Sequence, residues 1–189
     1  MTTERELAEA ALREAAALHE RTAADGVPGI LDATRVIRSA LLAGRKVLAF
    51  GNGGSATDAQ HLSEELVGRF TRERRGLPAL ALTDAAILTA VGNDYGYEHV
   101  FARQIEAFGQ PGDVAVGITT SGRSANVNLA LARARALGLA TVGLTGRDGG
   151  ETGGLVDVHV NVPAASSARV QEVQRTILHV ICELVERAL

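Results

Sequence analysis

Cysteine is nearly absent from this sequence, which has one, Cys182, among 189 residues. A single thiol excludes an internal disulfide framework and a zinc site built from several cysteines. Cys182 lies in an apolar helical pattern near the C-terminal end. That setting predicts a small buried side chain rather than a reactive thiol.

Aromatic side chains are also scarce, at 3% of the residues, whereas apolar residues of all kinds make up 46%. The core is therefore expected to be aliphatic and rich in alanine. Small aliphatic side chains suit helices that pack closely on a sheet.

Long apolar runs and large basic clusters are missing too. No run approaches the roughly 20 apolar residues that a membrane-spanning helix needs. The N-terminal stretch MTTERELAEAAL is polar and helical, without the apolar stretch of a signal peptide. The net charge is −3, and no basic cluster exists beyond Arg72–Arg75, which argues against a nucleic-acid partner. We therefore expect a cytoplasmic protein that binds neither membranes nor nucleic acid.

No interdomain linker or internal repeat divides the chain, and its length fits one domain, residues 1–189. Residues 1–44 are expected to form a helical segment with helices over 3–23 and 30–43. The well-patterned first helix favours a contact with another subunit. Residues 45–189 are expected to form an α/β core, with strands at 46–50, 79–82, 114–118, 140–144 and 156–160 and helices after residue 55 and at 85–91, 98–108, 125–137 and 169–189. This alternation predicts a doubly wound, parallel, five-stranded sheet flanked by helices.

The first candidate site is the glycine turn Gly51–Ala56, which follows an expected strand and precedes a helix that Ser55 can cap. A strand, a glycine turn and a helix N-terminus together form a ready phosphate site. The same residues fit the dinucleotide fingerprint G-x-G-x-x-A. That fingerprint expects an acidic residue about 20 positions later, whereas Asp84 follows the turn by about 30. No nucleotide cofactor is therefore expected.

The second candidate site is the polar turn Thr119–Ser124, again between a strand and a helix. It carries hydroxyls at Thr119, Thr120, Ser121 and Ser124. One hydroxyl is enough to cap a helix, so four are better explained by a phosphate ligand than by a polar cap. Because turns after different parallel strands open at the same edge of the sheet, this turn and the first can face one ligand.

The third candidate is a set of donors on two helices. His61 and Glu65 lie four residues apart and so share a helix face, and Gln171 and His179 lie eight apart on the terminal helix. Two imidazoles, a carboxylate and an amide can hold a divalent metal, although amide oxygen is an uncommon zinc ligand. Taken alone, His179 in its apolar surroundings is more often a core residue.

A fourth stretch, Gly92–Tyr97, is expected to be a loop. Asn93 and Asp94 in this loop can reach sugar hydroxyls. Alone, the stretch reads as an ordinary turn.

Together these stretches resemble the sugar isomerase (SIS) domain family, and within it the phosphoheptose isomerases. The matching stretches, in the family's order and spacing, are GNGGSATDAQHLSEELVGRF, TAVGNDYGYEHVFARQ, GDVAVGITTSGRSANV, VGLTGRDGG and ARVQEVQRTILHVICELVE. GNGGSA is shared by many SIS proteins, whereas Glu65, His179 and GNDYG point to the heptose enzymes.

The resemblance implies a homotetramer with active sites at subunit interfaces. It implies reversible conversion of D-sedoheptulose 7-phosphate into D-glycero-D-manno-heptose 7-phosphate through an enediol, with Glu65 and His179 as the acid/base pair. It also implies one zinc ion per subunit, with ligands that match His61, Glu65, Gln171 and His179. The residues implied to bind substrate are Asn52, Gly53, Gly54, Ser55, Glu65, Arg69, Asn93, Asp94, Thr119, Thr120, Ser121, Ser124 and Gln171. Of these, Arg69 is implied to reach a neighbouring subunit's ligand.

Three positions depart from the family pattern. Thr119 stands where serine is common, and it keeps the hydroxyl. Ala168 and Gln174 stand where aspartate and histidine often occur. None of the three removes an implied acid, base or metal ligand.

Two other functions fit the glycine turns. A non-catalytic SIS module that binds a replication initiator protein resembles this chain there, but such modules tend to lack the glutamate and the terminal-helix histidine that stand here at Glu65 and His179. An isomerase of another sugar phosphate is the second alternative.

Overall fold

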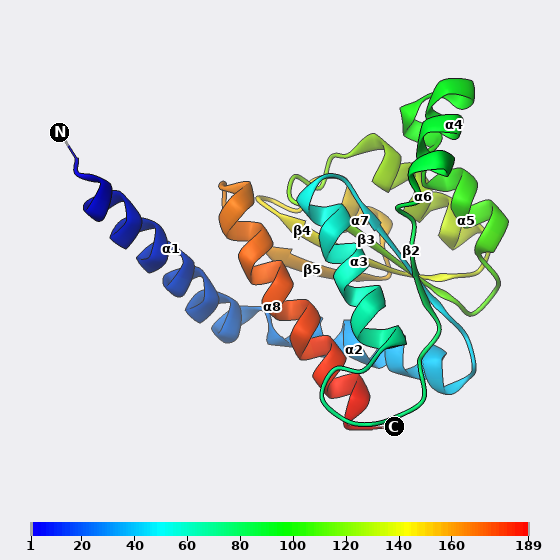
Figure 1. Cartoon of the computed structure of the whole chain (residues 1–189), viewed down its shortest axis with the longest axis horizontal. Helices are drawn as coiled ribbons and strands as arrows, with labels where there is room; N and C mark the ends of the chain where they lie inside the picture. Colours follow the sequence, from blue (N-terminus) through cyan, green and yellow to red (C-terminus); the bar gives the residue numbers. More distant parts are fainter. Residues whose placement is uncertain (1, 189) are drawn as a thin grey trace.

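The computed structural model describes residues 2–188 and has a five-stranded, fully parallel sheet at its centre (Figure 1). The strand order is β2-β1-β3-β4-β5, so successive strands are added on one side of β1 and then on the other, which places a topological switch point between β1 and β3. In register, Val47 of β1 lies beside Ala79 of β2 and Val114 of β3. The strands are β1 (Val47–Gly51), β2 (Ala79–Ala81), β3 (Val114–Thr119), β4 (Ala140–Gly146) and β5 (Val158–Val162).

Helices cover both faces of this sheet, as the sequence predicts for a doubly wound fold. They are α1 (Glu4–Asp25), α2 (Val27–Leu42), α3 (Gly54–Val67), α4 (Ala85–Tyr95), α5 (Ala102–Phe108), α6 (Ala125–Ala136), α7 (Thr152–Leu155) and α8 (Ser167–Glu186), with a 3₁₀ turn, η1 (Tyr97–His99), after α4. Helices α2, α3 and α8 lie on one face, and α5 and α6 lie on the other. Figure 1 shows α3 and α8 side by side in front of the sheet.

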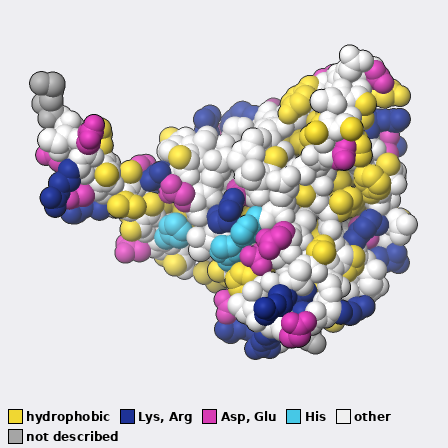
Figure 2. Space-filling view, in the orientation of Figure 1, with side chains coloured by type: hydrophobic (Ala, Val, Ile, Leu, Met, Phe, Trp, Pro, Cys, Tyr) yellow, Lys and Arg dark blue, Asp and Glu magenta, His cyan; other side chains and the backbone are white. Residues whose placement is uncertain are grey.

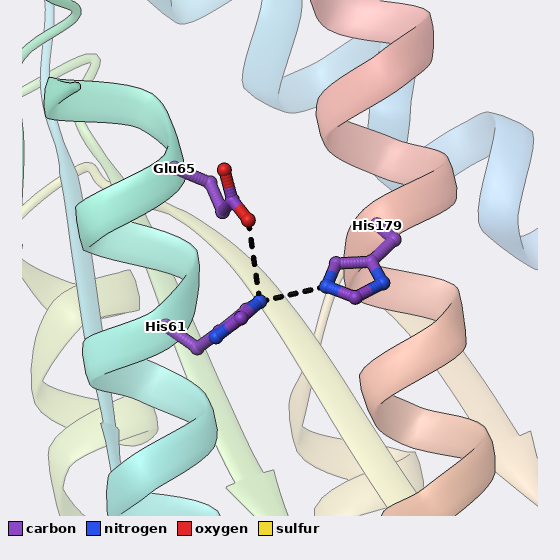
Figure 3. Close-up of side chains that lie close together, drawn as sticks. All are labelled: His61, Glu65 and His179. Carbon is purple, nitrogen blue, oxygen red and sulfur yellow. Dashed lines mark hydrogen bonds and ion pairs between the residues drawn. The ribbon is translucent and has the colours of Figure 1, made fainter. Parts of the chain in front are cut away.

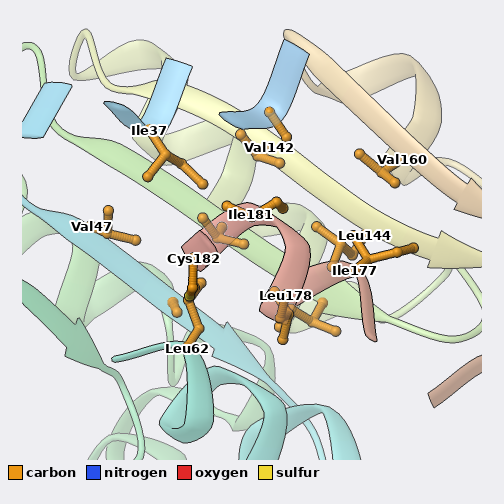
Figure 4. Packing of buried hydrophobic residues seen from close by; sticks show 14 of the residues in the cluster. Ile37, Val47, Leu62, Val142, Leu144, Val160, Ile177, Leu178, Ile181 and Cys182 are labelled. Atoms are coloured by element: carbon orange, nitrogen blue, oxygen red, sulfur yellow. The ribbon is translucent and has the colours of Figure 1, made fainter. Parts of the chain in front are cut away.

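The core has two apolar layers, one on each side of the sheet. Along β1, Val47 and Ala49 face the layer of α2, α3 and α8, whereas Leu48 and Phe50 face α5 and α6. Both faces of β1 are buried, which explains why it reads as a continuous apolar run rather than an alternating one. Figure 4 shows Leu62 of α3 and Ile177, Leu178 and Ile181 of α8 packed against the strands. The aliphatic core fixes where α3 and α8 lie, and those two helices carry the third candidate site.

Helix α1 projects from this body (Figure 1). A capping box between Thr3 and Glu6 closes its first turn. Among its apolar side chains only Leu18 is buried, whereas Leu7 is 60% and Leu12 is 71% exposed. Hydrophobic side chains are visible along this helix in Figure 2. The predicted apolar stripe is therefore largely unburied within one chain.

The parallel sheet and both N-terminal helices are confirmed, but some predicted local structure is wrong. Gly92–Gly96 is not a loop: Asn93 and Asp94 lie in the last turn of α4, which ends only at Gly96, where φ is 93°. Asp84 caps α4 by accepting a hydrogen bond from the Ile87 N–H, which stabilises the first turn of the helix. The helix then continues through the glycine at 92.

The predicted Ser55 cap is also wrong. Helix α3 begins at Gly54 after Gly53, whose φ is 56°, and no side chain caps it. Ser55 is therefore already in the first turn of the helix. The segment between the fourth and fifth predicted strands contains the short helix α7, and β5 starts at Val158 rather than at residue 156.

The terminal helix begins two residues before its predicted start. Ser166 caps it, and it runs to Glu186. The predicted end, Leu189, lies outside the described residues. Across residues 2–188, no helix has both the length and the apolar character needed to cross a membrane.

Candidate active site

Two helix N-termini lie close together at the topological switch point of the sheet, between β1 and β3. Strand β1 is followed by α3, and its parallel neighbour β3 is followed by α6. Ligands of open α/β sheets bind at such switch points, outside the carboxyl ends of the strands. The N-terminus of each helix carries a partial positive charge, which favours an anion there.

The polar side chains of the two turns line a small cavity of about 110 Å³ at this point. Thr119, at the end of β3, is only 3% exposed, and its hydroxyl lies 2.9 Å from the Ser124 hydroxyl. The Arg123 N–H donates to the Ser121 hydroxyl at 3.1 Å. The cavity lining is Asn52, Ser55, Ile118, Thr119, Thr120, Ser121, Ser124 and Gln171. The structure thus brings the first and second predicted candidates together around one pocket, hereafter the phosphate cavity.

The segment that follows β4, including the first residue of α7, packs against the second turn. Gly122 has a φ of 65° and packs directly against Gly149 and Gly150, so a side chain at position 122 has no room. Thr152 is fully buried, and its N–H and hydroxyl both lie 3.0 Å from the Gly122 carbonyl oxygen. These contacts fix the path of the hydroxyl-bearing turn.

Asn52 holds the two turns to each other. Its side-chain amide exchanges two hydrogen bonds of 2.9 Å with Asn126 of α6. The Tyr97 hydroxyl donates to the Asn52 Oδ1 atom at 3.0 Å. Asn126 and Tyr97 were not predicted as site residues, although Tyr97 ends the fourth candidate stretch, because both reach Asn52 only in the folded chain.

The third candidate site forms between α3 and α8 (Figure 3). The Nε2 atoms of His61 and His179 face each other at 2.7 Å, and the Glu65 Oε1 atom lies 3.4 Å from the His61 Nε2 atom. Figure 3 shows the three side chains pointing toward one another across the gap between the two helices. His61 and Glu65 are 26% and 15% exposed, so a ligand can reach them from solvent. In Figure 2 histidine and acidic side chains gather where α3 and α8 meet.

The donor chemistry of this cluster fits a divalent metal. Two imidazole nitrogens at 2.7 Å need a proton or a metal ion between them, because two lone pairs repel. The ligand atoms of His61, Glu65 and His179 all lie within 4.8 Å of one another. Two histidines and one glutamate form a recurring three-ligand zinc set that leaves a fourth position open.

Two further contacts orient the cluster. The ring of Phe70 packs against the His179 imidazole, with ring centroids 5.6 Å apart. Phe70 is held in turn by the buried Glu186 carboxylate, which accepts hydrogen bonds from the backbone N–H groups of Phe70, Thr71 and Arg72. Although burial would raise the pKa of Glu186, the hydrogen bonds from Thr71 and its neighbours lower it to about 2.

The remaining predicted site residues lie elsewhere. Gln171 places its amide directly against Gly54, at the wall of the phosphate cavity. It is eight residues, or about 12 Å of helix, from His179. Asn93 and Asp94 are exposed and hydrogen-bond to each other at 2.7 Å. Arg69 is exposed and lies 3.8 Å from Glu73. The lining of the phosphate cavity does not include Arg69, Asn93 or Asp94.

Two other sequence positions are now explained. Cys182 is 2% exposed, as predicted, and burial, with a smaller contribution from Glu65, raises its pKa to about 12. Gln174 is fully buried and donates to the Thr145 carbonyl oxygen at 3.1 Å. It therefore ties α8 to β4 rather than lining the phosphate cavity.

Comparisons with known proteins agree with this architecture. A family model described as SIS domain matches residues 12–146. A curated phosphoheptose isomerase from Geotalea daltonii is 57% identical over 163 residues, which cover 86% of this chain and 85% of that protein. Two solved phosphoheptose isomerases superpose closely. The one from Neisseria gonorrhoeae is 40% identical with a TM-score of 0.93 and covers 98% of this chain and 100% of its own. The one from Francisella tularensis is 36% identical with a TM-score of 0.94 and covers 98% of this chain and 99% of its own.

Proposed function

Because the chain belongs to the SIS domain family, and within it to the phosphoheptose isomerases, we propose that it interconverts D-sedoheptulose 7-phosphate and D-glycero-D-manno-heptose 7-phosphate. The observation that carries the proposal is the 57% identity to a phosphoheptose isomerase over 86% of the chain. A pocket built for a phosphate and an acid/base cluster, both on α3 and its neighbours, support it. The reaction is an aldose–ketose isomerisation, which moves a proton between two neighbouring carbons through an enediol.

The phosphate cavity anchors the substrate. Thr119, Thr120, Ser121 and Ser124 supply hydroxyls, Ser55 supplies another, and the N-termini of α3 and α6 supply backbone N–H groups. Gly53 leaves open space through which the substrate can approach the start of α3, whereas Gly54 leaves room for the Gln171 amide. Asn52 keeps the two turns at a fixed separation. Binding energy at the phosphate then orients the reacting carbons at the other end of the sugar.

The chemical step belongs to Glu65 and His179. Glu65, held on α3 near the imidazole of His61, removes the carbon-bound proton of the substrate and returns it to the neighbouring carbon. His179, oriented by the ring of Phe70, carries a proton to and from the substrate oxygens. His61 lies between the two and holds their relative positions.

The proposal includes one zinc ion per subunit. His61, Glu65 and His179 would hold it, and the sequence resemblance adds Gln171 as a fourth ligand. Zinc bound there would supply Lewis-acid polarisation of the substrate carbonyl. Gln171 is placed at the phosphate cavity, so its part in metal binding requires its side chain to turn away from Gly54.

The remaining parts of the proposal concern assembly and location. We expect a cytoplasmic homotetramer with active sites at subunit interfaces. The exposed apolar side chains of α1 support an additional subunit contact. The exposed positions of Arg69, Asn93 and Asp94, outside the phosphate cavity, suit residues that reach a ligand from a neighbouring subunit.

The test is turnover of sedoheptulose 7-phosphate by the purified full chain, followed by NMR with added zinc and with a chelator. We expect aldose formation by the wild-type protein and a loss of about 100- to 10,000-fold in kcat for Glu65→Gln and His179→Ala. A Glu65→Gln enzyme at near wild-type rate would refute the assignment of the base. The chelator arm tests whether metal takes part.

No turnover by a folded wild-type protein would contradict the proposal. The same preparation is then offered other ketose and aldose phosphates, which tests the second alternative. Binding to a replication initiator protein without any turnover would favour the module function. The presence of both Glu65 and His179 in one cluster argues against that outcome.

A further inference from the structure

A groove between the first turns of α3 and α8 adjoins the phosphate cavity. It has a volume of about 480 Å³, and its walls include Gly54 and Asp58 of α3 and Ala168, Gln171 and Arg175 of α8. Gln171 lines both the groove and the phosphate cavity, so the two spaces share a wall. A ligand anchored by its phosphate has this groove directly beside it.

Arg175 is held in the groove by a buried carboxylate. Asp58 is 2% exposed, and its Oδ1 atom accepts hydrogen bonds from the Nε and Nη2 atoms of Arg175 at 2.8 and 2.6 Å. The Arg175 side chain is 41% exposed. A guanidinium has five N–H donors, and only two of them are used in this pair. The other donors remain available to a ligand.

Burying a carboxylate is costly, and a pair of this kind contributes orientation more than stability. The Oδ2 atom of Asp58 is buried and has no hydrogen-bond partner among the described residues. The arrangement therefore holds the guanidinium in one orientation, and the desolvation of the Asp58 carboxylate costs free energy. A guanidinium held in this way is already oriented when a ligand enters the groove.

Every charged side chain that lines the groove is paired, which decides the kind of group the groove suits. Asp58 neutralises Arg175 at 2.6 Å, and Glu172 pairs with Arg169 at 2.6 Å. A second phosphate would find no excess positive charge here. Hydroxyl groups, which both donate and accept, match a guanidinium beside carboxylates. The small side chains of Gly54 and Ala168 leave room for a polyol chain.

The position of Arg175 along α8 agrees with this use. Gln171, Arg175 and His179 are spaced four residues apart and so lie on one face of the helix. Arg175 is thus one turn from the wall of the phosphate cavity and one turn from the acid/base cluster. A sugar phosphate that extends from the first toward the second passes this guanidinium.

We propose that Arg175, oriented by Asp58, binds a hydroxyl of the polyol part of the sugar phosphate and so contributes to substrate specificity. The inference rests on the proposed function, since it concerns the substrate of that site. It assigns Asp58 as a positioning residue that acts through Arg175.

The test compares Arg175→Met with wild type in three measurements: KM and kcat for sedoheptulose 7-phosphate, the inhibition constant of inorganic phosphate, and zinc affinity by calorimetry. We expect KM to rise about 10-fold, equivalent to about 1.4 kcal/mol, which is near the lower end of the range for a hydrogen bond to a charged group. The inhibition constant of phosphate and the zinc affinity are expected to stay unchanged, because Arg175 belongs neither to the lining of the phosphate cavity nor to the cluster of His61, Glu65 and His179. Arg187→Met is the matched control, since Arg187 is an exposed, paired arginine at the C-terminal end of α8.

Two results would overturn the inference. One is a KM within about 2-fold of wild type, which is too small for a lost charged hydrogen bond. The other is a joint change in KM, in the inhibition constant of phosphate and in zinc affinity, which would show that Arg175 holds α3 and α8 together rather than binding the substrate. If Arg175→Met does not fold, Arg175→Lys keeps the charge but not the planar fork, and the same criteria apply to it with an expected rise of about 3-fold.

Binding measured by calorimetry separates this inference from the proposed function. If wild-type protein binds sedoheptulose 7-phosphate without turning it over, the isomerase proposal fails. Weaker binding by Arg175→Met than by wild type, with equal binding of inorganic phosphate, would then still support the groove. Equal binding of the sugar phosphate by both proteins would refute it.

Discussion

At the scale of single residues, the phosphate cavity depends on hydroxyls that are already hydrogen-bonded to one another. Thr119 is the most buried of those on the second turn, and its oxygen lies between those of Ser121 and Ser124, at 3.4 and 2.9 Å. Removing it would leave its partners with unused bonding capacity beside the anion.

We predict that Thr119→Ser keeps KM for sedoheptulose 7-phosphate within about 3-fold of wild type, because the hydroxyl remains. Thr119→Val, which has the same shape without the oxygen, should raise KM by about 10-fold or more, with a smaller effect on kcat. Steady-state kinetics of the two variants measures this difference. Equal KM values for both would show that the hydroxyl does not contact the phosphate.

A second prediction concerns Cys182. Burial raises its pKa to about 12, so the thiol stays protonated near neutral pH and has no access to reagents. The folded protein should not react with an aromatic disulfide reagent at pH 8, and one equivalent should react after unfolding in guanidinium. Rapid labelling of native protein would contradict the buried position.

At the scale of elements, the segment after α3 is fastened to the end of α8 by one carboxylate. Glu186 accepts from three backbone N–H groups between Phe70 and Arg72 and from the Arg74 Nε atom at 3.0 Å. Arg74 in turn donates to the carbonyl oxygens of Glu65 and Leu66 at the end of α3. This network sets the path of the chain past His179, so a loss at Glu186 should reach the acid/base cluster.

We predict that Glu186→Gln lowers the free energy of unfolding by about 3 kcal/mol at pH 7, since an amide presents donors to a site made of donors. Glu183→Gln is the control, because Glu183 pairs with Arg187 at an exposed position where such pairs contribute little. Urea unfolding of the two variants measures the difference. Equal stability of the two variants would show that Glu186 is not a structural anchor.

The same carboxylate predicts a pH dependence. Its pKa is lowered from 4.5 to about 2, so the stabilisation is complete above about pH 4.5 and is lost as the pH falls toward 2. The stability difference between wild type and Glu186→Gln should therefore shrink across this interval. A difference that stays constant from pH 5 to pH 2.5 would contradict the lowered pKa.

At the scale of the whole molecule, α1 is only partly accommodated by its own chain. Its C-terminal half is tied to α8, where the His19 Nε2 atom lies 2.9 Å from the Thr176 hydroxyl. Arg169 reaches its middle and donates to the Ala11 carbonyl oxygen at 2.7 Å. Its N-terminal half projects into solvent and carries Leu7 and Leu12. A helix this exposed gains stability when its apolar side meets another surface.

We predict that Leu12→Glu shifts the proposed homotetramer to smaller species, because it places a charge on the exposed apolar side of α1. Arg13→Glu, a charge change at the neighbouring exposed position, serves as control. Light scattering after size-exclusion chromatography measures the mass of each. A Leu12→Glu protein with an unchanged mass would place the subunit contact elsewhere.

The sequence by itself determined the order of strands and helices, the two polar turns and the pairing of His61 with Glu65. These features are local: apolar periodicity, glycine turns and four-residue spacing follow from backbone geometry over a few residues. Local reasoning failed at Ser55 and at Asn93 and Asp94. Whether a helix begins one residue earlier or continues through a glycine depends on caps and packing outside the window.

Only the tertiary structure decided which distant side chains act together. His179 joins His61 across 118 positions, and Arg175 meets Asp58 across 117. Read alone, His179 is more often a core residue, and nothing in the sequence relates Arg175 to Asp58. The packing of α3 beside α8 on one face of the sheet, set by the aliphatic core, turns them into neighbours. Contacts of such long separation form only when burial of that core offsets the entropy of closing the chain between them.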